Sequence, residues 1–151
     1  MDTFESTLAA LTRLRVDFLV VGGLAVARAG FARMTDHLGL LVEPSRANLA
    51  RLIGALSTFG DGAASELTPD DFPVEEGAVR VAEDFDIDLF TVVSGQTYAD
   101  LLPETTSHDV DGVTVRFLGA EALIRLKSAS LRPKDRLDAE ALRAVQRGEF
   151  F

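Results

Sequence analysis

A largely apolar run that ends in two glycines constrains the fold of this chain more than any other feature. Residues 16–21 are rich in β-branched and large apolar side chains, and Gly22 and Gly23 follow directly. A short run of this kind, bounded by glycine, predicts a buried strand. Residues 24–29 then predict a short helix, and residues 35–42 predict a second strand. A strand, a sharp turn, a helix and another strand indicate a layered α/β domain.

The rest of the chain continues this alternation of helices and strands. Apolar periodicity predicts further helices over residues 3–15, 44–59, 97–102, 121–129 and 134–145. Further strands are predicted over residues 78–81, 85–93 and 113–118, with residues 60–77 as an irregular segment. Asp111 and Gly112 between two valines predict a hairpin turn. The expected architecture is a mixed, twisted sheet with flanking helices in one domain over residues 1–151.

Charge limits the partners that this chain can bind. The 24 acidic and 15 basic residues give a formal net charge of −9, which argues against extended nucleic-acid binding but leaves room for a pocket for one nucleotide. There are no cysteines, so thiolate metal sites and disulfides are excluded. The apolar segment over residues 16–27 is shorter than the about 20 residues that a membrane-spanning helix needs. Asp2 and Glu5 do not fit a signal peptide, so a cytoplasmic protein without a membrane anchor is expected.

The Gly22-Gly23 turn admits two interpretations. Glycines between a strand and a helix allow backbone N–H groups to approach a phosphate, and the start of a helix favours negative charge. A tight turn without any ligand explains the same two residues.

Two pairs of alternate residues are candidates for a metal site. His37 and Gly39 are two apart on one predicted strand, and Asp86 and Asp88 are two apart on another, so each pair shares a strand face. Carboxylates suit Mg²⁺, whereas one histidine with one carboxylate supplies too few ligands to define a zinc site. The alternative is that His37 is a half-buried polar residue and that both aspartates line a solvated strand face.

A cluster of cations follows the helix predicted over residues 121–129. Lys127, Arg132 and Lys134 lie close together in a chain that is otherwise acidic, and Asp135 follows them. A phosphate or nucleotide contact is one interpretation. Helix capping and a salt bridge across the turn form the other.

Taken together, these motifs resemble the nucleotidyltransferase superfamily, in the small bacterial branch that includes AbiEii-like toxins and minimal nucleotidyltransferases. The resemblance covers roughly residues 15–145. It is carried by four features: Gly22-Gly23, the Arg-x-Thr formed by Arg33 and Thr35, the strand with Asp88, and the run from Lys127 to Arg132-Pro133-Lys134-Asp135. In the family, an Asp-x-Asp stands where this chain has His37-Leu38-Gly39.

The resemblance implies a nucleotidyltransferase fold and a site for Mg²⁺ and a nucleoside triphosphate. It assigns Asp88, with His37, to the catalytic position, and Asp88 with Asp86 to the metal. It assigns nucleotide binding to Gly22, Gly23, Arg33, Thr35, Lys127, Arg132 and Lys134. Because the family's carboxylates hold the metal ions that activate the attacking hydroxyl, their replacement at residues 37 and 39 predicts a degenerate enzyme.

Three functions follow from that resemblance. The first is a degenerate nucleotidyltransferase that binds a nucleotide and has a regulatory or toxin–antitoxin-like role. The second is an active metal-dependent enzyme that transfers a nucleoside monophosphate with an unusual ligand set, and the third is an interaction or homodimerisation module. We expect the strands with His37 and Asp88 to be neighbours. We also expect a Gly23→Val substitution to block nucleotide binding while leaving the fold intact.

Overall fold

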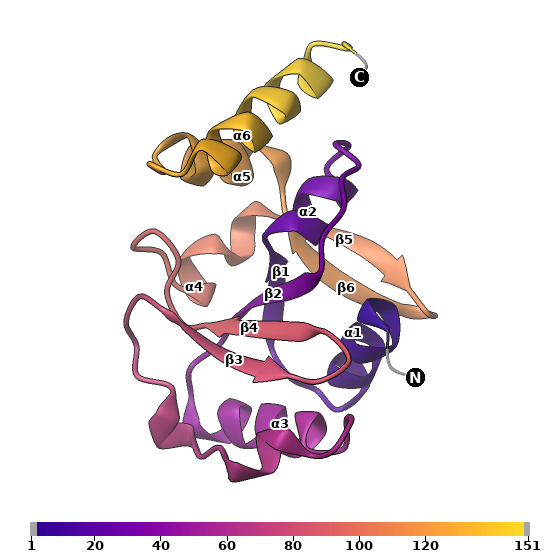
Figure 1. Ribbon diagram of the computed structural model, residues 1–151, viewed down its shortest axis with the longest axis vertical. Helices are drawn as coiled ribbons and strands as arrows, with labels where there is room; N and C mark the ends of the chain where they lie inside the picture. Colours follow the sequence, from indigo (N-terminus) through magenta and orange to yellow (C-terminus); the bar gives the residue numbers. More distant parts are fainter. Residues whose placement is uncertain (1–2, 150–151) are drawn as a thin grey trace.

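A six-stranded mixed sheet forms the centre of the computed structural model, which describes residues 3–149 (Figure 1). Its spatial order is β3-β4-β2-β1-β6-β5. The strands in chain order are β1 (Phe18–Val21), β2 (His37–Val42), β3 (Ala78–Ala82), β4 (Asp86–Phe90), β5 (Thr105–Val110) and β6 (Val113–Leu118). The pairs β1–β6 and β2–β4 are parallel, whereas β1–β2, β3–β4 and β5–β6 are antiparallel.

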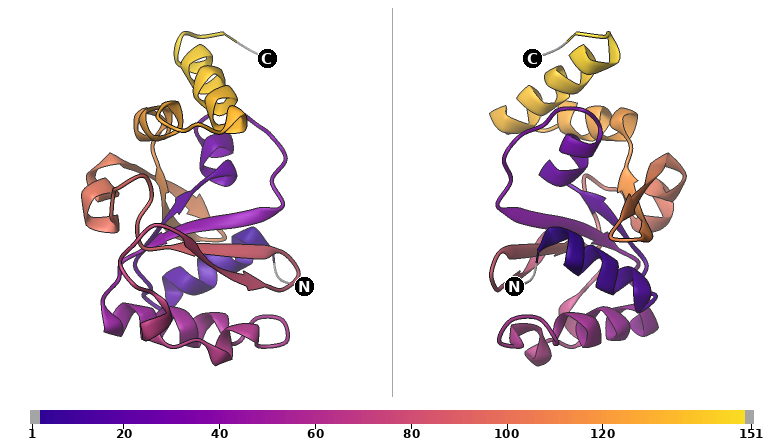
Figure 2. Two further views of the ribbon diagram at one scale, coloured as in Figure 1. Left: turned by 60° about the vertical axis from the view of Figure 1, so that its left-hand side comes forward. Right: turned by 90° about the vertical axis from the view of Figure 1, so that its right-hand side faces the viewer.

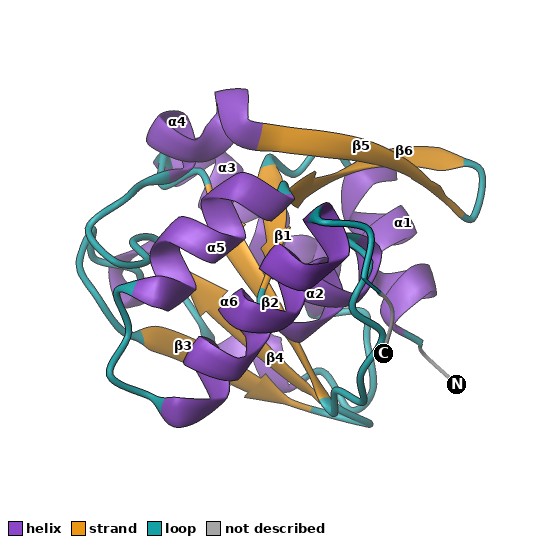
Figure 3. Ribbon diagram, turned by 90° about the horizontal axis from the view of Figure 1, so that it is seen from above, coloured by secondary structure: helices purple, strands orange, loops and turns teal. Residues whose placement is uncertain are grey.

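Helices cover both faces of this sheet. The α-helices are α1 (Phe4–Arg13), α2 (Gly23–Arg28), α3 (Arg46–Leu56), α4 (Tyr98–Leu101), α5 (Ala120–Ser128) and α6 (Pro133–Gln146). Three short 3₁₀ segments are η1 (Ala63–Glu66), η2 (Pro69–Asp71) and η3 (Leu102–Glu104). α1 and α3 lie on one side of the sheet, and α2, α5 and α6 lie on the other (Figures 1 and 3). The molecule is therefore the layered α/β domain that the sequence predicts. Within residues 3–149, no helix combines the length and the apolar character needed to cross a membrane.

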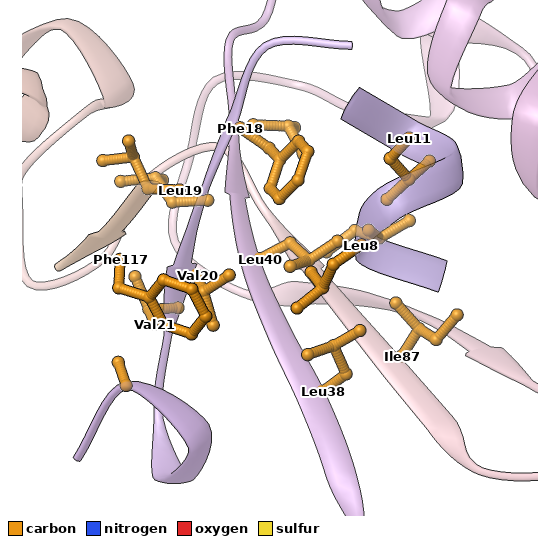
Figure 4. Packing of buried hydrophobic residues seen from close by; sticks show 14 of the residues in the cluster. Leu8, Leu11, Phe18, Leu19, Val20, Val21, Leu38, Leu40, Ile87 and Phe117 are labelled. Carbon is orange, nitrogen blue, oxygen red and sulfur yellow. The ribbon is translucent and has the colours of Figure 1, made fainter. Parts of the chain in front are cut away.

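One part of the core lies between the sheet and α1. Leu8 and Leu11 of α1 point toward Leu38 and Leu40 of β2 and toward Ile87 of β4 (Figure 4), and all of these side chains are buried. Because side chains alternate along a strand, burying Leu38 and Leu40 on this side turns His37 and Gly39 to the opposite side, where α2, α5 and α6 lie.

The predicted elements are found, with differences at their ends. The hairpin turn has φ of 49° at Asp111 and 84° at Gly112, as a two-residue turn with both central residues in the left-handed region requires. β4 ends at Phe90 rather than at residue 93, because the chain turns back at Ser94 and Gly95, both with positive φ. α3 ends at Leu56, because the side chains of Ser57 and Thr58 bond back to the carbonyl groups of the last turn.

Candidate functional site

The two strands with the candidate metal ligands are neighbours, as the sequence predicts, and they pair in parallel. His37 of β2 is opposite Asp86 of β4, and Gly39 is opposite Asp88. Opposite residues in a parallel pair face the same side of the sheet, so the four positions form one row of pairs on the face that carries α2, α5 and α6.

Arg80 of β3 binds both aspartates of this row. It is opposite Asp88 in the β3–β4 hairpin. Its Nε donates to Asp88 Oδ1 at 2.7 Å, and its Nη2 donates to Asp88 Oδ2 at 3.1 Å. Its Nη1 lies 3.5 Å from Asp86 Oδ2. The hydrogen-bonded Asp88 carboxylate raises the pKa of the Arg80 guanidinium, and the charges of Asp86 and Asp36 add to this effect. The positive charge beside Asp88 is therefore that of the Arg80 side chain.

Sequence reasoning did not single out Arg80, although the signal is present. Arg80 and Asp88 are equally distant in sequence from Asp84, so a tight hairpin centred there places them opposite each other. The alternative, a solvated strand face for both aspartates, is wrong for Asp88, which is only 7% exposed. It holds for Asp86, which is partly exposed. Asp88 is covered because Arg80 forms a two-bond contact with it from the next strand.

His37 is held at the start of β2 by its neighbour Asp36. The His37 Nδ1 lies 2.9 Å from Asp36 Oδ1. This hydrogen bond holds the pKa of the Asp36 carboxyl below its usual value, and the charge of Lys134 contributes in the same direction. Asp36 precedes the strand and is exposed.

Gly22 and Gly23 form the predicted turn, but the space beside Gly23 is filled by neighbouring side chains. Gly22 has a φ of 76° and a ψ of −153°, a conformation that favours glycine. A Cβ atom on Gly23 would lie 2.9 Å from Thr35 Oγ1 and 3.2 Å from Arg33 Nη2. A valine at residue 23 would therefore have to displace the Thr35 and Arg33 side chains, so Gly23→Val would not act on nucleotide binding alone.

Arg33 and Lys127 are brought together by Asp138 of α6. Arg33 Nη2 and Lys127 Nζ lie 3.0 and 3.1 Å from Asp138 Oδ2, and Lys127 Nζ also lies 3.1 Å from Asp135 Oδ1. Asp138 is buried, as is Arg33 Nε, which has no hydrogen-bond partner among the described residues. The pair of Lys127 and Asp135 is the salt bridge across the turn that one interpretation of the sequence anticipates. Asp138 was missed, although its spacing of three residues from Asp135 places both on one helix face.

Arg132 and Lys134 lie at the start of α6 and are exposed to solvent. They differ in this respect from Arg33 and Lys127, whose charges are offset by Asp138. The charge of Lys134 contributes to the lowered pKa of the Asp36 carboxyl, next to His37. The arrangement supplies positive charge for an anion without requiring a metal ion.

The residues on this face do not fit a magnesium ion. Asp88 is engaged by Arg80 through both carboxylate oxygens, and Arg80 also lies beside Asp86. Gly39 contributes no side chain, and His37 is a softer ligand than Mg²⁺ prefers. Within residues 3–149, no group of three or more histidine, aspartate or glutamate side chains is arranged to hold a metal ion.

No model of a known protein family matches this chain, and no curated protein matches it significantly. The resemblance to nucleotidyltransferases therefore stays a prediction from the sequence motifs.

Proposed function

We propose that this chain is a catalytically degenerate nucleotidyltransferase-like protein with the nucleotidyltransferase fold. It binds a nucleotide without transferring it, and it acts through that binding in a regulatory or toxin–antitoxin-like role. The proposal combines the sequence motifs with the geometry of the sheet face that carries His37, Gly39, Asp86 and Asp88.

The contact between Arg80 and Asp88 carries this proposal. Metal-dependent transfer needs carboxylates that are free to hold metal ions, which activate the nucleophile and neutralise the phosphates. Here a guanidinium group neutralises the one buried carboxylate of the row through bonds of 2.7 and 3.1 Å. Losing metal ligands costs several kcal/mol of transition-state stabilisation, which corresponds to a rate loss of roughly a thousandfold or more.

The exposed cations at the start of α6 support nucleotide binding. Arg33 and Lys127 are committed to Asp138, so we assign the phosphate contact to Lys134 and Arg132, which face solvent. Charge-assisted hydrogen bonds to phosphate are stronger than neutral ones. Because the metal site is neutralised internally, this binding does not depend on Mg²⁺.

Calorimetric titration with adenosine and guanosine triphosphates, with Mg²⁺ and with a chelator, tests this assignment. We expect similar affinity in both conditions, and an affinity about tenfold lower in Lys134→Ala. Arg136→Ala is the matched control, because Arg136 is also exposed in the first turn of α6 but donates to the Ser130 carbonyl. Equal affinity in Lys134→Ala and the wild type would contradict the assigned contact.

A transfer assay with labelled nucleoside triphosphate separates this proposal from an active enzyme. The wild-type protein should label neither itself nor added protein and RNA acceptors above background. Robust labelling that disappears in Asp88→Asn would show that the enzyme is active and that its metal site survives beside Arg80.

An interaction module is the second candidate function. It is favoured by three large apolar side chains at the α6 end of the molecule, where Met34 is 92%, Leu131 is 87% and Leu137 is 65% exposed. If no nucleotide binds the wild-type protein, this second function replaces the first.

A further inference from the structure

The end of α5, the start of α6 and the turn between them form a basic region on an acidic protein. Residues 127–137 carry four basic side chains and one acidic side chain, a net charge of +3. Because the whole chain carries −9, the other residues together carry −12. Positive charge that is concentrated in one short segment of an acidic protein indicates a partner that is locally acidic.

Three of these basic side chains are available to a partner. Arg132, Lys134 and Arg136 are exposed, and none of them forms an ion pair with a residue that the structure describes. The one acidic side chain of the segment, Asp135, is paired with Lys127 instead, at 3.1 Å. The net positive charge of the segment therefore lies on side chains that face solvent.

Two exposed leucines lie among these cations. Leu131 in the turn is 87% exposed, and Leu137 in the second turn of α6 is 65% exposed. A single exposed leucine is ordinary on a protein surface. Here, however, residues 131–137 hold two of the five large apolar side chains that are exposed in the described part of the chain. Exposed apolar side chains that are bordered by polar ones mark interaction sites. We call the following side chains the turn surface: Leu131, Arg132, Lys134, Arg136 and Leu137.

The turn surface lies away from the most acidic part of the chain. Residues 61–76 carry six acidic side chains and no basic one. They include η1 and η2, which contact α3 at one end of the molecule, whereas the α5–α6 hairpin lies at the other end (Figures 1 and 2). The sheet lies between the two ends, so their charges are screened from each other over a Debye length of about 10 Å. The acidic end therefore does not prevent an acidic segment from binding at the turn surface.

We propose that the turn surface binds an acidic, amphipathic segment of a partner protein. Carboxylates of that segment pair with Arg132, Lys134 and Arg136, and its apolar side chains cover Leu131 and Leu137. Exposed ion pairs contribute little individually, so the apolar contacts are needed for stable binding. Nucleic acids and anionic membranes also attract cations, but both present a high density of negative charge, which a chain with a net charge of −9 repels.

This inference stands without the proposed nucleotide binding. Arg132 and Lys134 also carry the proposed phosphate contact, but a phosphate group makes no contact that depends on a leucine side chain. Substitution of Leu131 and Leu137 should therefore weaken the binding of an acidic peptide and leave the nucleotide affinity unchanged.

Fluorescence anisotropy with a labelled synthetic peptide tests the leucines. The peptide consists of glutamates with leucines at helical spacing, and we expect a dissociation constant in the micromolar range for the wild-type protein. Leu131→Ser with Leu137→Ser should raise this constant about tenfold, because the apolar contacts are lost. Leu14→Ser with Val74→Ser is the matched control, since these side chains are 52% and 60% exposed and lie outside the turn surface. The control should bind like the wild type. Equal affinity in the wild type and the Leu131 and Leu137 variant would overturn the inference.

A charge reversal tests the cations with the same peptide. Arg136→Glu should raise the dissociation constant about tenfold, because an attractive contact becomes repulsive. Arg46→Glu in α3 is the matched control: it changes the net charge equally at the opposite end of the molecule and should have little effect. Both arginines are exposed, so both variants should unfold close to the wild-type temperature.

The choice of partner is tested with two further probes, which are vesicles of phosphatidylcholine and phosphatidylserine and single-stranded DNA. The wild-type protein should bind each of them more weakly than the acidic peptide. Tighter binding to either probe that is lost in Leu131→Ser with Leu137→Ser would assign the turn surface to a different partner and overturn the inference. A wild-type protein that binds no acidic peptide would overturn it as well.

Discussion

Asp88 shows how one side chain decides what this sheet face can do. Its carboxylate is 7% exposed, and a carboxylate removed from water is stable only when it is paired and hydrogen-bonded. Arg80 supplies this pairing from the adjacent strand. The same contact that stabilises Asp88 also neutralises the charge that a metal ion would need.

Arg80→Met should therefore lower the free energy of unfolding, because it leaves Asp88 buried without a partner. An unsatisfied buried polar group costs about 1–3 kcal/mol. Arg46→Met is the control, because the pair of Arg46 and Asp70 is exposed at both ends and should contribute little. Chemical denaturation of each variant measures the difference. Adding Asp88→Asn to Arg80→Met should restore much of the lost stability, because the unpaired charge is gone. If the two substitutions instead lower the free energy of unfolding by the sum of their separate effects, Arg80 and Asp88 do not interact directly.

At the scale of elements, the turn between α5 and α6 depends on ionised Asp135. Burial raises the pKa of this carboxyl, but the hydrogen bond from Ser130 and the charge of Lys127 outweigh that effect, so its pKa is lowered. A carboxyl with a depressed pKa stabilises the fold above its unfolded pKa of about 3.9, and this contribution is lost as the pH falls through the lower folded value.

Asp135→Asn should consequently be less stable than the wild type at neutral pH, by about 1 kcal/mol after allowing for solvent screening. The difference should shrink as the pH falls below about 4, because the carboxyl is protonated first in the unfolded chain and then, at its lower pKa, in the folded protein. Denaturant titrations at neutral and acidic pH measure it. A difference that is constant with pH would show that ionised Asp135 is not the source.

The elements were easier to predict than their contacts. Residues 16–21 and 113–118 are bounded by glycine and carry β-branched side chains, so local patterns are sufficient to place their strands. That the strands with His37 and Asp88 are neighbours was anticipated only through the family resemblance. Arg80 and Asp138 were missed because their spacings place them on a hairpin and on a helix face, but their partners are set by the hairpin register and by the packing of α6 against the loop with Arg33.

At the scale of the whole molecule, the fold joins distant segments at one sheet face. β2 and β4 supply the row of His37, Gly39, Asp86 and Asp88, and β3 adds Arg80. Gly39 is buried within this row, and a Cβ atom there would lie 3.3 Å from the Val21 carbonyl oxygen. An aspartate side chain at this position would therefore be crowded by the Val21 backbone, which would not happen on an open, solvated face.

This geometry predicts that restoring an Asp-x-Asp at residues 37 and 39 does not by itself restore a metal site. His37→Asp with Gly39→Asp should lower the unfolding temperature, because it adds two carboxylates beside Asp86 and Asp88 and crowds Val21. It should not gain Mg²⁺ affinity, because Arg80 still holds Asp88. Adding Arg80→Gln frees Asp88, so only the triple variant should bind Mg²⁺ and be stabilised by it. Calorimetry and thermal unfolding with and without Mg²⁺ measure both effects. The uncharged control is the triple variant with asparagine in place of aspartate at residues 37 and 39. Equal Mg²⁺ binding by the double and triple variants would show that Arg80 does not block the site.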